Sequence, residues 1–289
     1  MRWFSGLAPR RRALLSGVAV LVLAMVVAVV VLAGGDGTAA VSAQEPLTLK
    51  PGGASPSRSA TAAAKRPGPV LLVPGYGGGR SALNQLAARI RHAGRQAEVV
   101  QLPGDGTGDL NLQAKALQSA AARALRGGAS SVDVVGYSAG GVVVRLWLAE
   151  FGGDREARRV VSLGSPLHGA DIAAVGAALA PDACPVACQQ LVPGSSLLNR
   201  LNAQPLPTGI GWMSIWTTDD KTVTPPESAR LTGAVNVVAQ DICPNEFVSH
   251  SGLPTDALVT GLVLAAIGSG PLTAPHRADC ARLRSRGRA

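Results

Sequence analysis

The chain has 289 residues, a formal net charge of +9 and an aromatic content of 3%. This length allows one or two domains, and so few aromatic residues mean that the core must be built mainly from valine, leucine, isoleucine and alanine. The positive charge lies at the two ends, because residues 67–270 sum to −1. Since no aromatic platform for stacking bases lies between the terminal arginines, the sequence argues against a nucleic-acid partner.

The N-terminal residues 1–33 have the pattern of a membrane-targeting segment. Several arginines precede an uncharged apolar run over residues 13–33. These 21 residues would cross the roughly 30 Å hydrocarbon core as a helix, whereas the apolar core of a cleaved signal is shorter. We therefore expect a signal anchor with its arginines in the cytoplasm. Val41-Ser42-Ala43 would serve as a cleavage site, so secretion is the alternative.

Residues 34–66 are rich in glycine, alanine, serine, proline and threonine, which is typical of a flexible linker. This linker would hold a folded domain, residues 67–270, outside the cytoplasm but at the membrane. Within that domain, residues 70–73 have the pattern of a buried strand, and helical patterns follow over residues 81–93 and 112–125. The alternation predicts an α/β fold with a mostly parallel central sheet and helices on both faces.

A glycine-rich turn, Pro74-Gly75-Tyr76-Gly77-Gly78-Gly79, joins the first strand to its helix. A phosphate-binding loop of the P-loop type would need a lysine and a hydroxyl after the last glycine, but Arg80 and Ser81 follow here. The spacing of a dinucleotide fingerprint is also missing. The turn therefore needs another explanation.

A second motif, Gly136-Tyr137-Ser138-Ala139-Gly140, lies between a β-branched run at residues 132–135 and an apolar stretch at residues 142–148. A strand, a sharp turn and a helix with serine at the apex are typical of a nucleophile elbow, whose glycines avoid collisions with neighbouring elements. Ser138 would be the nucleophile. The N–H of Ala139, at the start of the helix, would stabilise an oxyanion, and the glycine-rich turn would supply a second donor from Tyr76.

A serine nucleophile needs a base, and the base needs an orienting acid. In folds with such an elbow the chain order is serine, acid, histidine. Of the four histidines, His92 lies upstream of the serine and His276 lies in an arginine-rich end with no strand around it. His168 precedes every candidate acid, so we expect His250 to be the base.

The acid is a choice between neighbouring residues. Asp219 and Asp220 follow a strand expected at residues 212–217, and His250 follows the next expected strand, residues 234–239. We expect Asp220 to orient the histidine, with Asp219 pointing away and capping the turn. Asp241 and Asp256 are weaker candidates, and either could cap a helix instead.

Residues 170–202 follow a strand expected at residues 159–163 and are rich in alanine, leucine and valine. They would lie on the side of the sheet where the serine emerges. An apolar surface there would suit an acyl chain, but an ordinary helix packed on the core explains the same pattern. The substrate-binding residues therefore stay undetermined.

Four cysteines allow complete pairing in three ways, which fits an exported protein. We favour Cys184–Cys188, which closes a short loop, and Cys243–Cys280, which would tie the C-terminal end to the loop before His250. The spacing offers neither a C-x-x-C pair nor nearby histidine ligands for a metal. Residues 271–289 form a basic tail, which we expect to be a solvated end, with contact to an anionic envelope surface as the alternative.

Together these motifs resemble the bacterial α/β-hydrolase lipases, in particular the small secreted class 2 lipases of Gram-positive bacteria. The resemblance covers about two hundred residues and also includes Gly164-Ser165-Pro166-Leu167-His168-Gly169 and Val248-Ser249-His250. It implies an α/β-hydrolase fold and hydrolysis of a carboxylic ester, such as an acyl-glycerol or a similar lipid, through an acyl-enzyme, without metal or cofactor. Family lipases often have two adjacent histidines where Leu167 and His168 stand, so we expect His168 to make a supporting hydrogen bond near the serine loop rather than to act in catalysis.

Two classes of function are compatible with these features. The first is an extracytoplasmic serine ester hydrolase, and the second is a membrane-tethered interaction protein that keeps the fold without turnover. Within the first class, an acyltransferase or thioesterase acting on envelope lipids would use the same acyl-enzyme. Neither the acyl-chain length nor the oligomeric state follows from the sequence.

Overall fold

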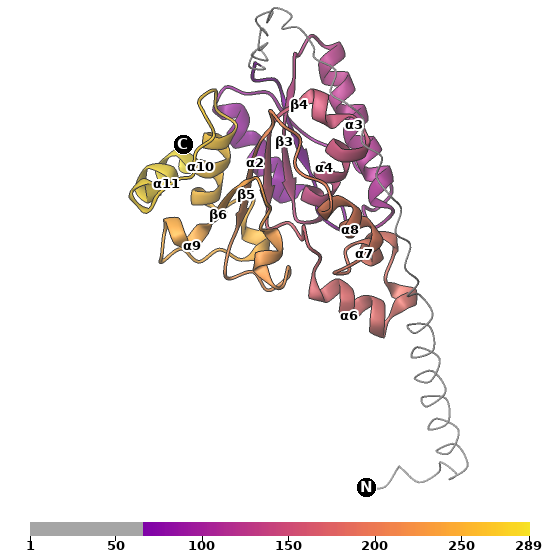
Figure 1. The fold of residues 1–289 in the computed structure, drawn as a ribbon. Helices are drawn as coiled ribbons and strands as arrows, with labels where there is room; N and C mark the ends of the chain where they lie inside the picture. Colours follow the sequence, from indigo (N-terminus) through magenta and orange to yellow (C-terminus); the bar gives the residue numbers. More distant parts are fainter. Residues whose placement is uncertain (1–65) are drawn as a thin grey trace, which may run out of the picture. The chain divides into compact units, whose positions relative to one another are not determined.

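The computed structural model describes residues 66–289, so the expected anchor and almost all of the linker lie outside the described residues. Within this range the strands form one six-stranded sheet in the order β2-β1-β3-β4-β5-β6 (Figure 1). All neighbouring strands are parallel, as the alternating pattern predicted. The strands are β1 (Val70–Val73), β2 (Ala97–Val99), β3 (Val132–Tyr137), β4 (Ala157–Leu163), β5 (Gly211–Trp216) and β6 (Val235–Val238).

Helices cover both faces of the sheet, because side chains that alternate along a strand point to opposite faces. In β1, Val70 and Leu72 pack with the apolar sides of α2 (Ser81–His92) and α10 (Ala257–Ala266). Leu71 and Val73 pack instead with α3 (Leu110–Arg126) and α4 (Ala139–Glu150). Two apolar cores therefore hold the sheet between helix layers (Figure 1).

The strand order reverses direction at β1, which lies between β2 and β3. The segment after β1 leads through α2 to β2 on one side, and α3 then returns the chain to β3 on the other side. In open parallel sheets, the carboxyl ends of two strands at such a reversal form the crevice where ligands bind. The loops that follow β1 and β3 are therefore brought together at this edge of the sheet.

The segment between β4 and β5 contains α6 (Asp171–Leu179), α7 (Val186–Gln190) and α8 (Ser196–Asn202). The other short elements are α5 (Gly153–Glu156), α9 (Ala239–Ile242) and the 3-10 turns η2 (Pro181–Ala183), η3 (Pro226–Ala229), η4 (His250–Gly252) and η5 (Arg277–Asp279). No helix in residues 66–289 has both the length and the apolar character needed to span a membrane.

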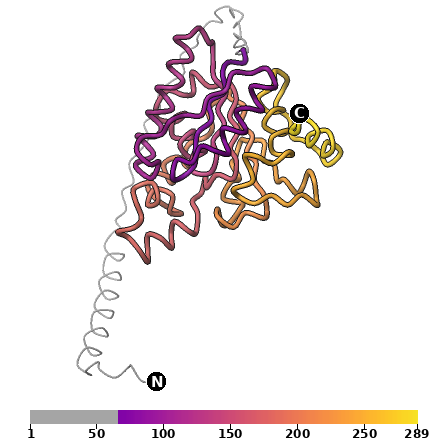
Figure 2. The backbone as a smooth tube through the Cα atoms, turned by 180° about the vertical axis from the view of Figure 1, so that it is seen from behind, coloured from indigo at the N-terminus to yellow at the C-terminus, as the bar shows by residue number. Residues whose placement is uncertain are grey.

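The C-terminal end differs from the solvated tail that its charge predicted. Residues Cys280–Arg288 form helix α11, which packs beside α10 (Figures 1 and 2). Leu283 is buried, and two glycines make the close packing of the helices possible. A Cβ on Gly261 would lie 2.0 Å from the carbonyl oxygen of Leu283, and one on Gly287 would lie 1.8 Å from that of Ala257. The folded part of the chain therefore extends through α11.

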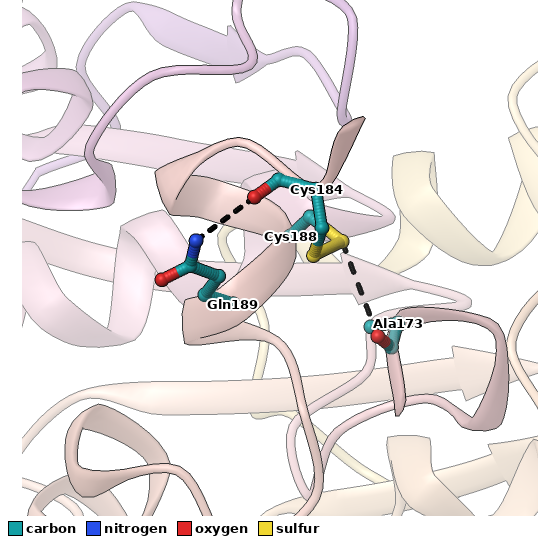
Figure 3. Close-up of a disulfide and its surroundings, with 4 residues drawn as sticks. All are labelled: Ala173, Cys184, Cys188 and Gln189. Atoms are coloured by element: carbon teal, nitrogen blue, oxygen red, sulfur yellow. Dashed lines mark hydrogen bonds between the residues drawn. A yellow bond between two sulfur atoms is a disulfide. The ribbon is translucent and has the colours of Figure 1, made fainter. Parts of the chain in front are cut away.

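Both expected disulfides are confirmed. Cys184–Cys188 closes a loop with a sequence separation of 4, and Cys243–Cys280 joins residues 37 positions apart. The short bridge lies at the start of α7, where the Gln189 side chain donates a hydrogen bond to the Cys184 carbonyl oxygen and Cys188 Sγ faces the Ala173 carbonyl (Figure 3). The long bridge fastens the first residue of α11 to the end of α9.

Removing the Cys243–Cys280 bridge should destabilise the protein more than removing Cys184–Cys188. In the chain-entropy model a loop of this length contributes roughly 3–4 kcal/mol, whereas the short ring restrains little of the unfolded chain. Because the long bridge also fastens the segment that leads to His250, ester turnover should fall together with Tm. Thermal unfolding and turnover of the Cys243→Ser/Cys280→Ser pair are compared with those of Cys184→Ser/Cys188→Ser, and equal losses would contradict this prediction.

Candidate active site

The turn between β3 and α4 places Ser138 at its apex. Ser138 has φ 53° and ψ −129°, and it is the only non-glycine residue with positive φ in the described part of the chain. A Cβ on Gly136 would lie 2.6 Å from Gly141 Cα, and one on Gly140 would lie 2.3 Å from the Val73 carbonyl oxygen. The two glycines of the motif are therefore required by the approach of α4 and β1, as the elbow interpretation predicted.

Ser138, His250 and Asp220 form one chain of hydrogen bonds. His250 Nε2 lies 3.0 Å from Ser138 Oγ, and His250 Nδ1 lies 2.6 Å from Asp220 Oδ2. Asp220 is 2% exposed and His250 8% exposed, whereas Ser138 is partly accessible. The buried acid is thus linked through the ring to a serine oxygen that a substrate can reach.

The carboxylate of Asp220 is fixed by its own turn. Its Oδ1 atom accepts hydrogen bonds from the backbone N–H groups of Thr222 and Val223, both at 2.8 Å. This arrangement leaves Oδ2 for the histidine. Val223 itself is buried. The acid is therefore oriented before any substrate binds.

Asp219 points away from the histidine, as expected, but it does not cap the turn. Its Oδ2 accepts hydrogen bonds from Gln240 Nε2 at 3.0 Å and from the N–H of Val248 at 3.3 Å. The N–H groups of the turn are taken by Asp220 instead, which makes the capping prediction for Asp219 wrong. Asp219 connects the loop after β5 to the segment just before His250.

The other two candidate acids lie apart from the histidine ring. Asp256 caps α10, accepting a hydrogen bond from the N–H of Val259 at 2.9 Å. Asp241 is exposed on α9. Neither carboxylate is hydrogen-bonded to His250, which is consistent with their lower rank in the sequence analysis.

Two residues that sequence reasoning did not single out also position the histidine. Gln240 donates from Nε2 to Thr217 Oγ1 and to the Glu246 carbonyl oxygen as well as to Asp219. Tyr137 donates its hydroxyl to the His250 carbonyl oxygen at 3.2 Å, and the two rings lie 5.2 Å apart. Burial, with a smaller contribution from Asp220, raises the pKa of Tyr137 to about 12, so its hydroxyl stays protonated.

Gly164 leaves room for the acid and the base. It follows β4 with φ 52°, and a Cβ there would lie 3.2 Å from Asp220 Oδ2 and 3.3 Å from His250 Nδ1. The same Cβ would meet Leu253 Cδ1 at 2.5 Å. A glycine in the sequence Gly164-Ser165-Pro166 is therefore required by the packing behind the histidine. The sequence showed this motif but not its reason.

The glycine-rich turn after β1 lies against the serine. A Cβ on Gly75 would come within 2.8 Å of Ser138 Cβ, and Tyr76 is the next residue along this turn. The N–H of Ala139 is at the first position of α4, where a helix has no internal acceptor. Among the hydrogen bonds of residues 66–289, neither N–H has a protein acceptor. Both N–H groups that were expected to bind an oxyanion are therefore without a protein acceptor in the described residues.

The remaining histidines are not part of this chain of hydrogen bonds. His168 is exposed, and its ring Nδ1 lies 3.1 Å from the Ser228 carbonyl oxygen in η3. The hydrogen bond of this ring is therefore made to η3 and not to the loop of Ser138. His92 and His276 are exposed, and His276 caps η5.

The segment after β4 contains one helix that packs on the core and one helix with an exposed apolar side. Helix α8 packs on the core through buried Leu197, Leu198 and Leu201. Helix α6 instead exposes Ile172, Val175 and Leu179, which lie on one side of the helix because of their spacing. Helix α6 therefore has an exposed apolar side, whereas α8 packs on the core.

The described residues combine an all-parallel sheet with a nucleophile elbow after β3, an acid after β5 and a histidine after β6. The chain has the α/β-hydrolase fold. Within residues 66–289, no cluster of three or more histidine, cysteine or acidic side chains is arranged to hold a metal ion. The arrangement of this hydrolase fold can activate a serine oxygen and stabilise an oxyanion next to it.

Solved structures of lipases have the same fold. The mature form of Bacillus licheniformis lipase BlEst2 is 19% identical with a TM-score of 0.59, and the match covers 71% of this chain and 93% of that one. Lipase B of Aspergillus fumigatus is also 19% identical, with a TM-score of 0.58, covering 71% and 53%. This α/β-hydrolase chain thus spans about half the length of the fungal lipase.

A further match is a metagenome-derived lipolytic enzyme from the work describing LipS and LipT. It is 18% identical with a TM-score of 0.55, and the match covers 71% of this chain and 94% of that one. No family model and no curated protein sequence matches the chain. The structural matches bear out the resemblance to α/β-hydrolase lipases at the level of the fold.

Proposed function

We propose that this protein is a serine hydrolase that cleaves carboxylic esters through an acyl-enzyme. One observation supports this most strongly, namely the hydrogen-bonded chain from Ser138 through His250 to Asp220 beside two N–H groups without protein acceptors. No single motif would place all of these groups within reach of one substrate carbon. The function follows from their combination.

In the proposed reaction His250 Nε2 takes the proton of Ser138 as its oxygen attacks the ester carbonyl. The N–H groups of Tyr76 and Ala139 stabilise the oxyanion that forms. His250 then protonates the leaving alcohol, and the acyl group stays on the serine. Water, activated by the same histidine, attacks the acyl-enzyme and releases the acid. Asp220 stabilises the charged ring throughout both halves of the reaction.

For the substrate we propose a lipid ester such as an acyl-glycerol. The apolar side of α6 lies in the segment after β4 and offers a surface for an acyl chain. The proteins with the same fold named above are lipases and lipolytic enzymes. Comparing p-nitrophenyl esters of increasing chain length tests this choice, and a preference for acetate over longer chains would contradict it.

A fluorophosphonate probe tests the chemistry itself. Such a probe should label the wild-type protein at Ser138, because it forms a stable adduct only with an activated serine oxygen. Ser138→Ala is the control that should stay unlabelled, and peptide mapping identifies the modified residue. If the folded wild-type protein took up no label, the proposal would be refuted. The protein would then have the hydrolase fold without an activated serine.

We further propose that the enzyme acts outside the cytoplasm, attached to the membrane through residues 13–33. The charge and apolar pattern of residues 1–33 and the two disulfides support this location. The full-length chain should sediment with membranes, and a chain beginning at Lys65 should be soluble and active. A mature N-terminus at Gln44 in the culture medium would instead show secretion after cleavage.

A further inference from the structure

Helix α11 presents a basic face to solvent. Its opposite side packs on α10 through Leu283 and Gly287, and the Cys243–Cys280 bridge fixes its first residue. Five arginines lie between η5 and the end of the helix, of which four are exposed: Arg277, Arg282, Arg286 and Arg288. The arginines therefore sit on a fixed helix rather than on a disordered end.

The acidic residues near this helix offset only part of its charge. Arg282 pairs with Asp279 at 2.7 Å, and Arg284 pairs with the largely buried Glu246 at 3.4 Å. Arg89 of α2 donates a hydrogen bond to the carbonyl oxygen of Gly287, so the basic last turn of α2 adjoins the end of α11. Asp241, exposed on the neighbouring α9, is a further acid. Arginines outnumber acids on this surface.

An exposed aromatic side chain lies in the segment that is joined to α11. Phe247 is 80% exposed. It follows Glu246, the ion-pair partner of Arg284, and comes four positions after Cys243, which is bonded to α11. A single exposed phenylalanine is unremarkable by itself. Here an ion pair and a disulfide tie the segment that carries Phe247 to the arginine-rich helix α11.

We propose that α11 and Phe247 form a docking surface for an anionic lipid membrane. Arginines close to the surface attract anionic headgroups, and an aromatic ring enters the boundary between headgroups and acyl chains. Single-stranded nucleic acid would need several aromatic side chains along a groove, and this surface has one. The combination of charge and one apolar anchor fits a lipid surface.

This docking surface is a property separate from ester hydrolysis. The segment that carries Phe247 continues directly to His250. Docking would therefore turn the side of the domain that carries this segment toward the membrane. The surface does not use Ser138, His250 or Asp220, and a variant without turnover should still dock. Failure of docking and failure of catalysis are therefore separate results.

Tryptophan fluorescence of the full-length Phe247→Trp variant tests the proposal. The protein is reconstituted in vesicles of phosphatidylcholine carrying bromine on its acyl chains, with or without one third phosphatidylglycerol. Wild-type protein supplies the background from the native tryptophans. The variant should show additional quenching in the anionic vesicles and none in the neutral ones, because bromine quenches only a ring that reaches the acyl boundary.

Charge variants in the Phe247→Trp background complete the experiment. Arg277→Gln/Arg282→Gln should lower the additional quenching to the level of neutral vesicles. The matched pair Arg123→Gln/Arg126→Gln, exposed on α3 across the sheet, should leave it unchanged. Turnover of a soluble ester checks that each variant is folded. The proposal would be overturned if the additional quenching were equal in anionic and neutral vesicles or absent from both. It would also be overturned if the two arginine pairs had equal effects. Heparin binding without quenching would also overturn it.

Discussion

Replacing Ser138 with alanine should abolish ester hydrolysis while leaving the fold intact. The change removes one oxygen, and the glycines that allow the turn stay in place. Loss of a member of such a triad commonly costs about 10⁴-fold or more in turnover. Initial rates with a p-nitrophenyl ester measure the loss, and circular dichroism with thermal unfolding shows that the variant is folded.

The result also decides whether Ser138 is the nucleophile or only lies near the reacting atoms. A folded Ser138→Ala variant that kept a tenth of the wild-type turnover would contradict the proposed role. Residual activity far below that level is expected from the oxyanion donors, since the N–H groups of Tyr76 and Ala139 are unaffected by the substitution.

Replacing His250 with alanine should be as damaging as losing the serine. The ring is the only group hydrogen-bonded to both Ser138 and Asp220 in the described residues, so no other base is in place to take the proton. Turnover should fall by about 10⁴-fold or more at neutral pH. The same ester assay as for Ser138→Ala measures the loss.

His168→Ala is the matched control for this experiment. Its ring Nδ1 donates one hydrogen bond to the Ser228 carbonyl oxygen, and one such bond contributes about 1 kcal/mol, so turnover should fall by no more than about fivefold. If His168→Ala were the inactive variant and His250→Ala retained activity, the assignment of the base from chain order and geometry would be wrong.

Much of the fold could be predicted from the sequence because its signals are local. The strands β1 and β3 are short apolar runs that end in glycine-rich turns, and α3 has a clear helical pattern that extends from Leu110 to Arg126. The elbow could be located because the glycines next to Ser138 follow from contacts inside one turn and its neighbouring strand.

The parts that sequence reasoning missed depend on contacts between distant segments. Nothing near Gln240 indicates that its amide joins the loops before Asp220 and His250. The prediction for the C-terminal end was wrong for the same reason. The arginines dominate its composition, whereas its packing depends on one leucine and on Gly287 meeting α10, which lies more than twenty residues earlier in the chain.

At Ser138 the residue that catalysis needs is not the residue that would give the highest thermal stability. A non-glycine residue in such a sparsely populated region costs of order 1–3 kcal/mol, and φ is 53° at this serine. Glycine would adopt the same turn without that strain, but it has no oxygen with which to attack. A library of variants selected only for heat resistance would therefore tend to collect inactive proteins at residue 138. Directed evolution of this enzyme needs an activity screen in every round.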